Sequence, residues 1–166
     1  MRNAETILAA TKDRGKEGKL LEGIYRQLYN PELYLHSYSR LYRNDGAMTK
    51  GVTAETVDGM SLEKINGIID RIRYERYRWT PVRRVHIPKK GGKTRPLGIP
   101  TWSDKLLQDV VRALLEAYYE PRFSDHAHGF RPGRGCHTAL QRIKRVWHGT
   151  KWFIEGDIKG CFDHAW

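Results

Sequence analysis

The chain from Val82 to Leu115 reads VRRVHIPKKGGKTRPLGIPTWSDKLLQDVVRALL, which joins the pattern of a basic β-hairpin to that of a helix. Residues 82–88 and 95–99 are strand-like, and the Lys-Lys-Gly-Gly-Lys run between them has the composition of a turn. Proline donates no ladder hydrogen bond, so the prolines of this segment restrict both strands to edges or ends. From residue 101, a capping-box pattern predicts a helix whose apolar stripe is Leu106, Leu107, Val110, Val111, Leu114 and Leu115.

Helical patterns dominate the rest of the chain. Residues 4–43 predict two or three helices, interrupted near Gly15 and Gly18 and at Asn30-Pro31. Residues 44–59 are typical of a loop, and a helix is expected over about 61–77, with an apolar face of Leu62, Ile65, Ile68, Ile69 and Ile72. Two further elements are expected: a strand over 151–158, and a helix over 137–148 that buries Leu140, Ile143, Val146 and Trp147. The fold class is therefore α+β, mostly helical with a basic β-hairpin.

The basic charge is concentrated in one block. The 166 residues carry a net charge of +11, and residues 71–95 account for +9 of it, with Glu75 as their only acidic residue. Side chains so placed repel one another and favour a polyanionic partner such as nucleic acid. The alternative is a solvated basic face without a partner.

Cysteine content and apolar runs bear on the compartment. Cys136 and Cys161 form neither a disulfide framework nor a CxxC pair, which favours a reducing compartment. A zinc site with His126 and His128 matches no standard ligand spacing. No apolar run reaches membrane-spanning length, and residues 1–10 lack the long apolar core of a signal peptide, so we expect a soluble intracellular protein without a membrane partner.

The hairpin turn carries the first candidate site. Gly91-Gly92-Lys93-Thr94 is similar to the end of an ATPase phosphate loop, but Ile87 stands where that motif needs glycine, and the context is a hairpin. A flexible basic hairpin can fold over a triphosphate, with lysines as point charges and arginine as a bidentate fork. A general RNA-facing hairpin explains the segment equally well. The residues concerned are Lys89, Lys90, Lys93 and Arg95.

A second basic segment lies at residues 128–135, with the sequence His-Gly-Phe-Arg-Pro-Gly-Arg-Gly. Glycines let backbone approach a nucleic-acid strand, and Arg131 and Arg134 can hold phosphates. A structural turn explains the glycines as well.

Asp157 is the candidate metal ligand. It follows the apolar run of the expected strand on a glycine, and a bare carboxylate at the end of a buried strand needs a partner such as a metal ion. Asp163 comes six residues later and has a simpler explanation, the capping of a helix.

Together, four segments in order and spacing resemble the group II intron reverse transcriptase (maturase) family. The resemblance covers about residue 45 to the end and less distinctively the N-terminal helices. It rests on Ile87-Pro88-Lys89, Arg95-Pro96-Leu97-Gly98-Ile99-Pro100-Thr101, His128-Gly129-Phe130-Arg131-Pro132-Gly133-Arg134 and Gly156-Asp157-Ile158-Lys159-Gly160-Cys161-Phe162-Asp163.

The resemblance implies the fingers subdomain and the first palm strand of a right-hand polymerase, truncated after them. The divisions would be residues 1–60 for an N-terminal helical extension and loop, 61–150 for the fingers and 151–166 for the start of the palm. The partners would be intron RNA as template, a DNA primer and dNTPs.

The resemblance also implies site residues. Asp157 would be the catalytic carboxylate, binding Mg²⁺ together with the backbone carbonyl of Ile158. Lys89 and Arg95 would contact the incoming dNTP, and Phe162 would exclude a ribose 2′-hydroxyl. The RNA-binding residues would be Arg83, Arg84, Lys90, Lys93, Trp102, Arg131 and Arg134.

Two alternatives from other classes stay open. One is a non-catalytic RNA-binding module that helps intron RNA to fold or splice, and the other is a folded remnant without function. The resemblance fits a bacterial cytoplasmic protein associated with ribonucleoprotein, with an organelle as the alternative location.

The family's second palm motif, aromatic-Ala-Asp-Asp, does not occur in these 166 residues. Because two Mg²⁺ ions need carboxylates from both motifs, whether this chain is itself an enzyme is uncertain. We expect a polypeptide of these 166 residues alone to give no templated product in a primer-extension assay. Templated extension by the purified chain would contradict this expectation.

Overall fold

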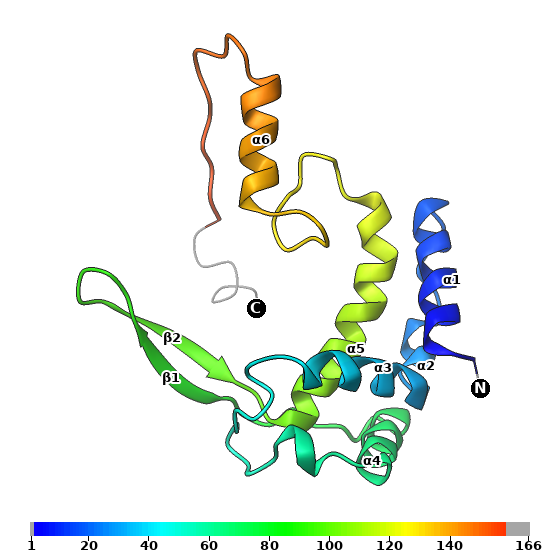
Figure 1. The fold of residues 1–166 in the computed structure, drawn as a ribbon. Coiled ribbons are helices and arrows are strands. Elements are labelled where there is room, and N and C mark those ends of the chain that lie inside the picture. Colours follow the sequence, from blue (N-terminus) through cyan, green and yellow to red (C-terminus); the bar gives the residue numbers. More distant parts are fainter. Residues whose placement is uncertain (1, 159–166) are drawn as a thin grey trace. The chain divides into compact units, whose positions relative to one another are not determined.

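The computed structural model describes residues 2–158, which form six α-helices, two short 3₁₀ turns and one β-hairpin (Figure 1). The elements in chain order are α1 (Ala4–Lys16), α2 (Ile24–Gln27), α3 (Pro31–Tyr42), η1 (Val57–Gly59), α4 (Leu62–Arg73), β1 (Arg83–Pro88), β2 (Thr94–Ile99), α5 (Trp102–Tyr119), η2 (Glu120–Arg122) and α6 (Cys136–Val146). The chain divides into two compact units, residues 1–123 and 124–166. None of the helices in the described range is long and apolar enough to cross a membrane.

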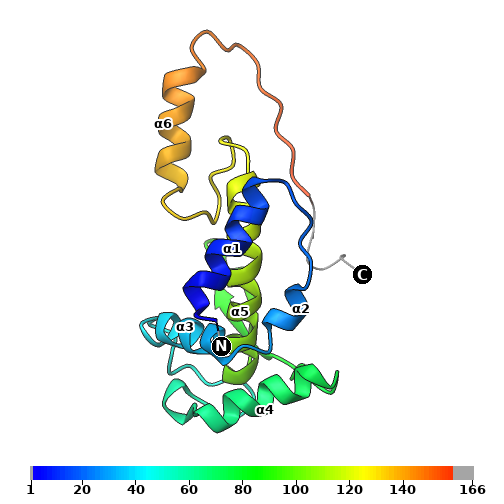
Figure 2. The ribbon, with the colours of Figure 1, turned by 90° about the vertical axis from the view of Figure 1, so that its right-hand side faces the viewer.

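Helix α5 is the centre of the first unit. Helix α1 lies along it in both views (Figure 1 and Figure 2), and α3 packs against it as well. The backbone of Tyr118 in α5 approaches Gly15 in α1 so closely that a Cβ on Gly15 would lie 2.1 Å from the Tyr118 carbonyl oxygen. Gly15 lies inside α1, because the helix ends at Lys16. The predicted interruption near Gly15 therefore comes one residue later, at the end of the helix.

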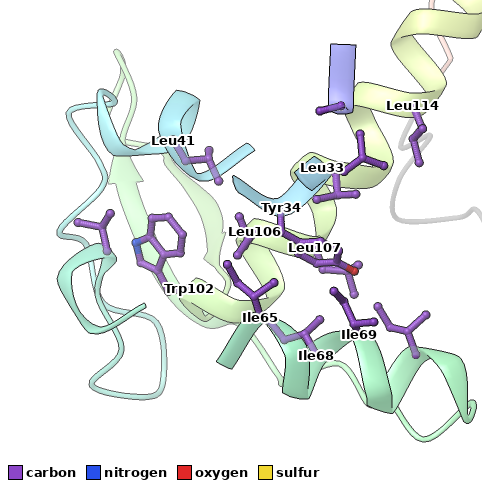
Figure 3. Packing of buried hydrophobic residues seen from close by; sticks show 14 of the residues in the cluster. Leu33, Tyr34, Leu41, Ile65, Ile68, Ile69, Trp102, Leu106, Leu107 and Leu114 are labelled. Atoms are coloured by element: carbon purple, nitrogen blue, oxygen red, sulfur yellow. The ribbon is translucent and has the colours of Figure 1, made fainter. Parts of the chain in front are cut away.

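The core is formed mainly by α3, α4 and α5 (Figure 3), and α1, the loop 44–59 and η1 add Ala4, Ile7, Ala47 and Val57. The predicted apolar stripes are largely confirmed, because a helix buries the side chains that recur every three or four residues. Two expected core residues are exposed instead, namely Leu62 at the first position of α4 and Leu115 on α5. The core side chains from these three helices are Leu33, Tyr34, Leu41, Ile65, Ile68, Ile69, Ile72, Trp102, Leu106, Leu107, Val110 and Leu114.

The start of α5 is fixed by a buried carboxylate. Asp104, only 2% exposed, accepts hydrogen bonds from the Thr101 hydroxyl at 2.7 Å, the Tyr77 hydroxyl at 2.7 Å and the Thr80 backbone N–H at 3.1 Å. Thr101 caps the helix in return by accepting the Asp104 N–H. Burial and the hydrogen bond to Asp104 both raise the pKa of Tyr77, so its hydroxyl stays protonated and remains a donor.

A second carboxylate on α5 joins it to α3. Asp109, buried like Asp104, accepts hydrogen bonds from Arg40 on α3 and from Arg112 one turn along α5. Burial alone would raise the pKa of Asp109, but the hydrogen bonds from the two arginines outweigh it and lower the pKa.

Two predictions for the second unit are wrong. No strand forms over the predicted range 151–158, where the described residues run as irregular chain (Figure 1). A strand needs a partner for its backbone groups, and within 124–158 no other strand offers one. The apolar residues Leu140, Ile143, Val146 and Trp147 are exposed rather than buried, because α6 is the only helix of that range and nothing in it forms a facing layer.

We expect Asp104→Ala to lower the free energy of unfolding by about 2–4 kcal/mol, since the Tyr77 hydroxyl and the Thr80 N–H lose their acceptor. Urea denaturation followed by circular dichroism measures the change. Asp45→Ala, the same change at an exposed loop position, is the matched control and should stay within about 0.5 kcal/mol of the wild type. Equal effects of the two changes would contradict this role of Asp104.

The lowered pKa of Asp109 predicts a pH dependence of stability. A carboxyl whose pKa is lower in the folded state stabilises the fold above its unfolded value, 3.8, and that contribution is lost as the pH falls through the folded pKa. Asp109→Asn should therefore destabilise the chain by about 1–3 kcal/mol at neutral pH and progressively less below pH ~4. Denaturation midpoints across this pH range measure the effect, and Asp45→Asn should shift them equally little at every pH.

Candidate nucleic-acid interface

The hairpin is built as the sequence predicts. Strands β1 and β2 pair antiparallel, with Val85 opposite Leu97 and Ile87 opposite Arg95. The turn is closed by a hydrogen bond of 2.7 Å from the Lys89 N–H to the Lys93 carbonyl. Its two glycines, Gly91 and Gly92, have φ of 87° and 74°, in the left-handed region where a side chain is strained.

The two faces of the hairpin differ in character. Side chains alternate across a strand, so Val85, Ile87 and Leu97 share one face with Arg95 near the tip. The opposite face presents Arg84 and His86 beside the prolines and Gly98. The lysines at the tip are exposed, as is Arg95. This arrangement places cationic groups where a phosphate chain can reach them.

The base of the hairpin is fastened to the loop 44–59. Arg83 donates from Nε and Nη2 to the Lys50 carbonyl, at 3.1 and 2.9 Å. On the exit side, the N–H and hydroxyl of Ser103 both donate to the Glu55 carboxylate, at 3.1–3.3 Å. Arg83 and Arg84, both expected to bind RNA, are both exposed, and Arg83 has two of its donors on a backbone carbonyl in this structure.

Trp102 is a core residue. Its side chain lies among the buried residues (Figure 3) and is 1% exposed. Its Nε1–H donates to the Ala47 carbonyl at 2.7 Å, and its ring centroid lies 5.8 Å from that of Tyr38. The prediction that Trp102 contacts RNA does not fit this position, because no face of the ring reaches the surface. The helix pattern places residue 102 in the first turn, but it gives no indication that the loop 44–59 covers the ring.

Arg131 and Arg134 brace the loop at residues 124–135 of the second unit. Arg131 Nη1 donates to the carbonyls of Ser124 and Ala127, at 2.8 and 2.9 Å. Arg134 donates to the carbonyl and the carboxylate of Asp125, both at 2.7 Å, and this contact lowers the pKa of Asp125. These contacts therefore support the interpretation of this segment as a structural turn. Phosphate binding by the same arginines stays a prediction.

His128 connects this loop to the start of α6. Its Nδ1 lies 2.8 Å from the Thr138 hydroxyl, which in turn accepts the Gly135 N–H at 2.9 Å. Burial lowers the pKa of His128, and the positive charges of Arg134, Arg142 and Arg131 lower it further, so the ring is neutral near pH 7.

The described residues do not form a magnesium site. Asp157 and Ile158 lie exposed in irregular chain, and no group of three or more His, Cys, Asp or Glu side chains that could hold a metal ion is present in residues 2–158. Mg²⁺ needs several oxygen ligands in octahedral geometry, and one exposed carboxylate does not supply them. Phe162, the predicted selector against ribose, lies outside the described residues.

The comparison with known proteins agrees with the family resemblance of the sequence motifs. Residues 87–166 match the family "Reverse transcriptase (RNA-dependent DNA polymerase)". Over 142 residues, 85% of this chain, the sequence is 55% identical to the group II intron-encoded protein LtrA of Lactococcus lactis subsp. cremoris. It is 48% identical over 136 residues, 82% of the chain, to an uncharacterized 91 kDa protein in the cob intron of Schizosaccharomyces pombe.

A shorter similarity extends to plants. Over 66 residues, 40% of this chain and 9% of the relative, the sequence is 40% identical to the mitochondrial nuclear intron maturase 1 of Arabidopsis thaliana. The chain spans 24% of the length of LtrA and 17% of the fission-yeast protein. The hairpin and loop motifs lie inside the region of similarity to LtrA. Residues 87–166 of this chain belong to the reverse transcriptase family, and the chain is similar to proteins encoded by group II introns.

Proposed function

We propose that this chain forms the fingers and the beginning of the palm of a group II intron RNA-directed DNA polymerase, and that its hairpin binds the RNA template and the incoming dNTP. The observation that carries the proposal is the exposed basic tip of a hairpin whose base is fastened to the loop 44–59 through Arg83 and, at the start of α5, through Ser103. A fixed base lets the tip hold a phosphate in a defined place, which a loose basic loop does not do.

Lys89 and Arg95 are the proposed triphosphate contacts. Both are exposed, Lys89 at the start of the turn and Arg95 opposite Ile87 on the second strand. Lysine offers a compact charge, and arginine adds a planar fork that fits two phosphate oxygens at once. In the complete enzyme, the family resemblance assigns Mg²⁺ to Asp157 and Ile158 and the discrimination against ribose to Phe162.

A second function is favoured by the same surface. The basic hairpin needs neither a metal ion nor a primer to bind RNA, and one relative is named as a nuclear intron maturase. A non-catalytic role in the folding or splicing of intron RNA is therefore the alternative, in a bacterial cytoplasm or in an organelle. Primer extension separates the two functions in a protein that contains both palm motifs.

RNA binding by the hairpin is tested by salt dependence. Replacing Lys89, Lys90 and Lys93 together by Gln should weaken binding of single-stranded RNA and lower the slope of log Kd against log salt by up to ~2, since each lost phosphate contact contributes about 0.7. Fluorescence anisotropy with a labelled RNA strand at several salt concentrations measures both quantities.

The matched control removes the same charge elsewhere. Lys12, Lys16 and Lys19 are exposed in and just after α1, and two of them pair with Asp13 and Glu17. Their replacement by Gln should leave the slope within about 0.5 of the wild-type value. Equal slopes for the two triple variants would mean that the net charge, rather than the hairpin, binds RNA.

A further inference from the structure

The segment between α4 and β1 alternates arginine with aromatic residues and reads Tyr-Glu-Arg-Tyr-Arg-Trp over 74–79. Trp79 is 56% exposed and Tyr74 is 62% exposed, so two large rings face solvent in the most basic part of the chain. Neither the family motifs nor the hairpin assigns these rings a role.

Trp79 is exposed yet held in place. Tyr77, two positions before it, and Thr80, directly after it, each donate to one carboxylate oxygen of Asp104, through the Tyr77 hydroxyl at 2.7 Å and the Thr80 N–H at 3.1 Å. The Trp79 ring contacts the Tyr77 ring edge to face, with centroids 5.4 Å apart and planes at 77°. A ring that is positioned beforehand loses little conformational freedom when a ligand binds.

Arginines of this segment and of the end of α4 lie next to its tyrosines. The Arg71 guanidinium lies over the Tyr77 ring at 5.5 Å, and that of Arg76 lies over the Tyr74 ring at 5.6 Å. Arg78 donates to the carbonyls of Glu75 and Tyr77. An edge-to-face contact covers at most one face of the Trp79 ring, so Tyr77 leaves at least one face uncovered.

We propose that Trp79 is a stacking platform for a base of single-stranded RNA, with Arg71, Arg76 and Arg78 next to its phosphates. The proposal rests on the proposed RNA-binding function and adds a site apart from the hairpin tip. An aromatic ring stacks on any base that is free of its partner, and arginine pairs with the adjacent phosphates. A duplex hides the faces of its bases, so the site discriminates between the two forms of RNA.

A purely structural role makes a different prediction. If Trp79 only shields the hydrogen bond between Tyr77 and Asp104, any apolar side chain of moderate size can replace it without loss of RNA affinity. Trp79→Leu keeps an apolar cover but removes the aromatic face, whereas Trp79→Phe keeps a smaller aromatic face. Comparison of the two variants therefore distinguishes base stacking on Trp79 from mere shielding of the hydrogen bond between Tyr77 and Asp104.

The experiment measures the affinity of the whole chain for a short oligo(A) strand and for an RNA duplex of equal length, over a range of salt. Trp79→Leu should weaken binding of the strand roughly 5- to 100-fold. The slope of log Kd against log salt should not change in this variant, because no charge is lost. Affinity for the duplex should stay as in the wild type, and Trp79→Phe should remain within roughly threefold for the strand.

Tyr42→Leu is the matched control. Tyr42 is 54% exposed, and its ring rests on that of Tyr38 at 5.9 Å, much as Trp79 rests on Tyr77. This variant should bind both RNAs as the wild type does. Thermal melting of each variant checks that the fold is retained.

Two results would overturn the proposal that Trp79 stacks on a base. One is an unchanged affinity for the single strand in a folded Trp79→Leu variant, and the other is an equal loss of affinity for the strand and the duplex. Should Trp79→Leu fail to fold, the quenching of tryptophan fluorescence by the bound strand decides. Quenching should be smaller in Trp79→Phe than in the wild type, and equal quenching would contradict stacking on Trp79. A wild-type chain that binds neither RNA refutes the proposed function itself, a result distinct from the loss of the platform alone.

Discussion

The first unit depends on one buried carboxylate. Asp104 receives hydrogen bonds from its own helix cap, from the tyrosine after α4 and from the backbone just before the hairpin. It thereby joins three stretches that are separated by up to 27 positions in sequence. A carboxyl group is stable in a protein interior only when such donors satisfy its oxygens. The cap of the central helix and the path of the chain into the hairpin are consequently set by the same group.

Arginine and lysine have different uses in this fold. Arg40, Arg83, Arg131 and Arg134 direct their planar forks at carboxylates and carbonyls of the chain itself. The lysines of the hairpin turn are exposed at its tip. This division follows from chemistry, because a guanidinium satisfies several acceptors in fixed geometry while an ammonium group keeps its hydration and its freedom. A high basic content therefore overstates the charge that a polyanion can reach.

The sequence alone predicts the helices of the first unit, the hairpin and its turn, because periodicity and turn chemistry are local. It fails where the outcome depends on distant partners. The strand expected over 151–158 has the right composition, but pairing requires a neighbour that composition does not reveal. The family resemblance implies an RNA contact for Trp102, which is buried instead, since only the folded chain brings the Ala47 carbonyl to its indole. Arginine and aromatic residues alternate over 74–79, but only the folded chain determines that the rings of Tyr74 and Trp79 are exposed.

The prolines of the hairpin affect how the protein behaves at high concentration. Both strands are open edges among the described residues, and an open edge is a template on which another chain can add a strand. Pro88 and Pro96 each remove one donor from those edges, and the positive tip repels a second copy. A ribbon that is bare on both sides is thus protected against the intermolecular β-association that leads to fibrils.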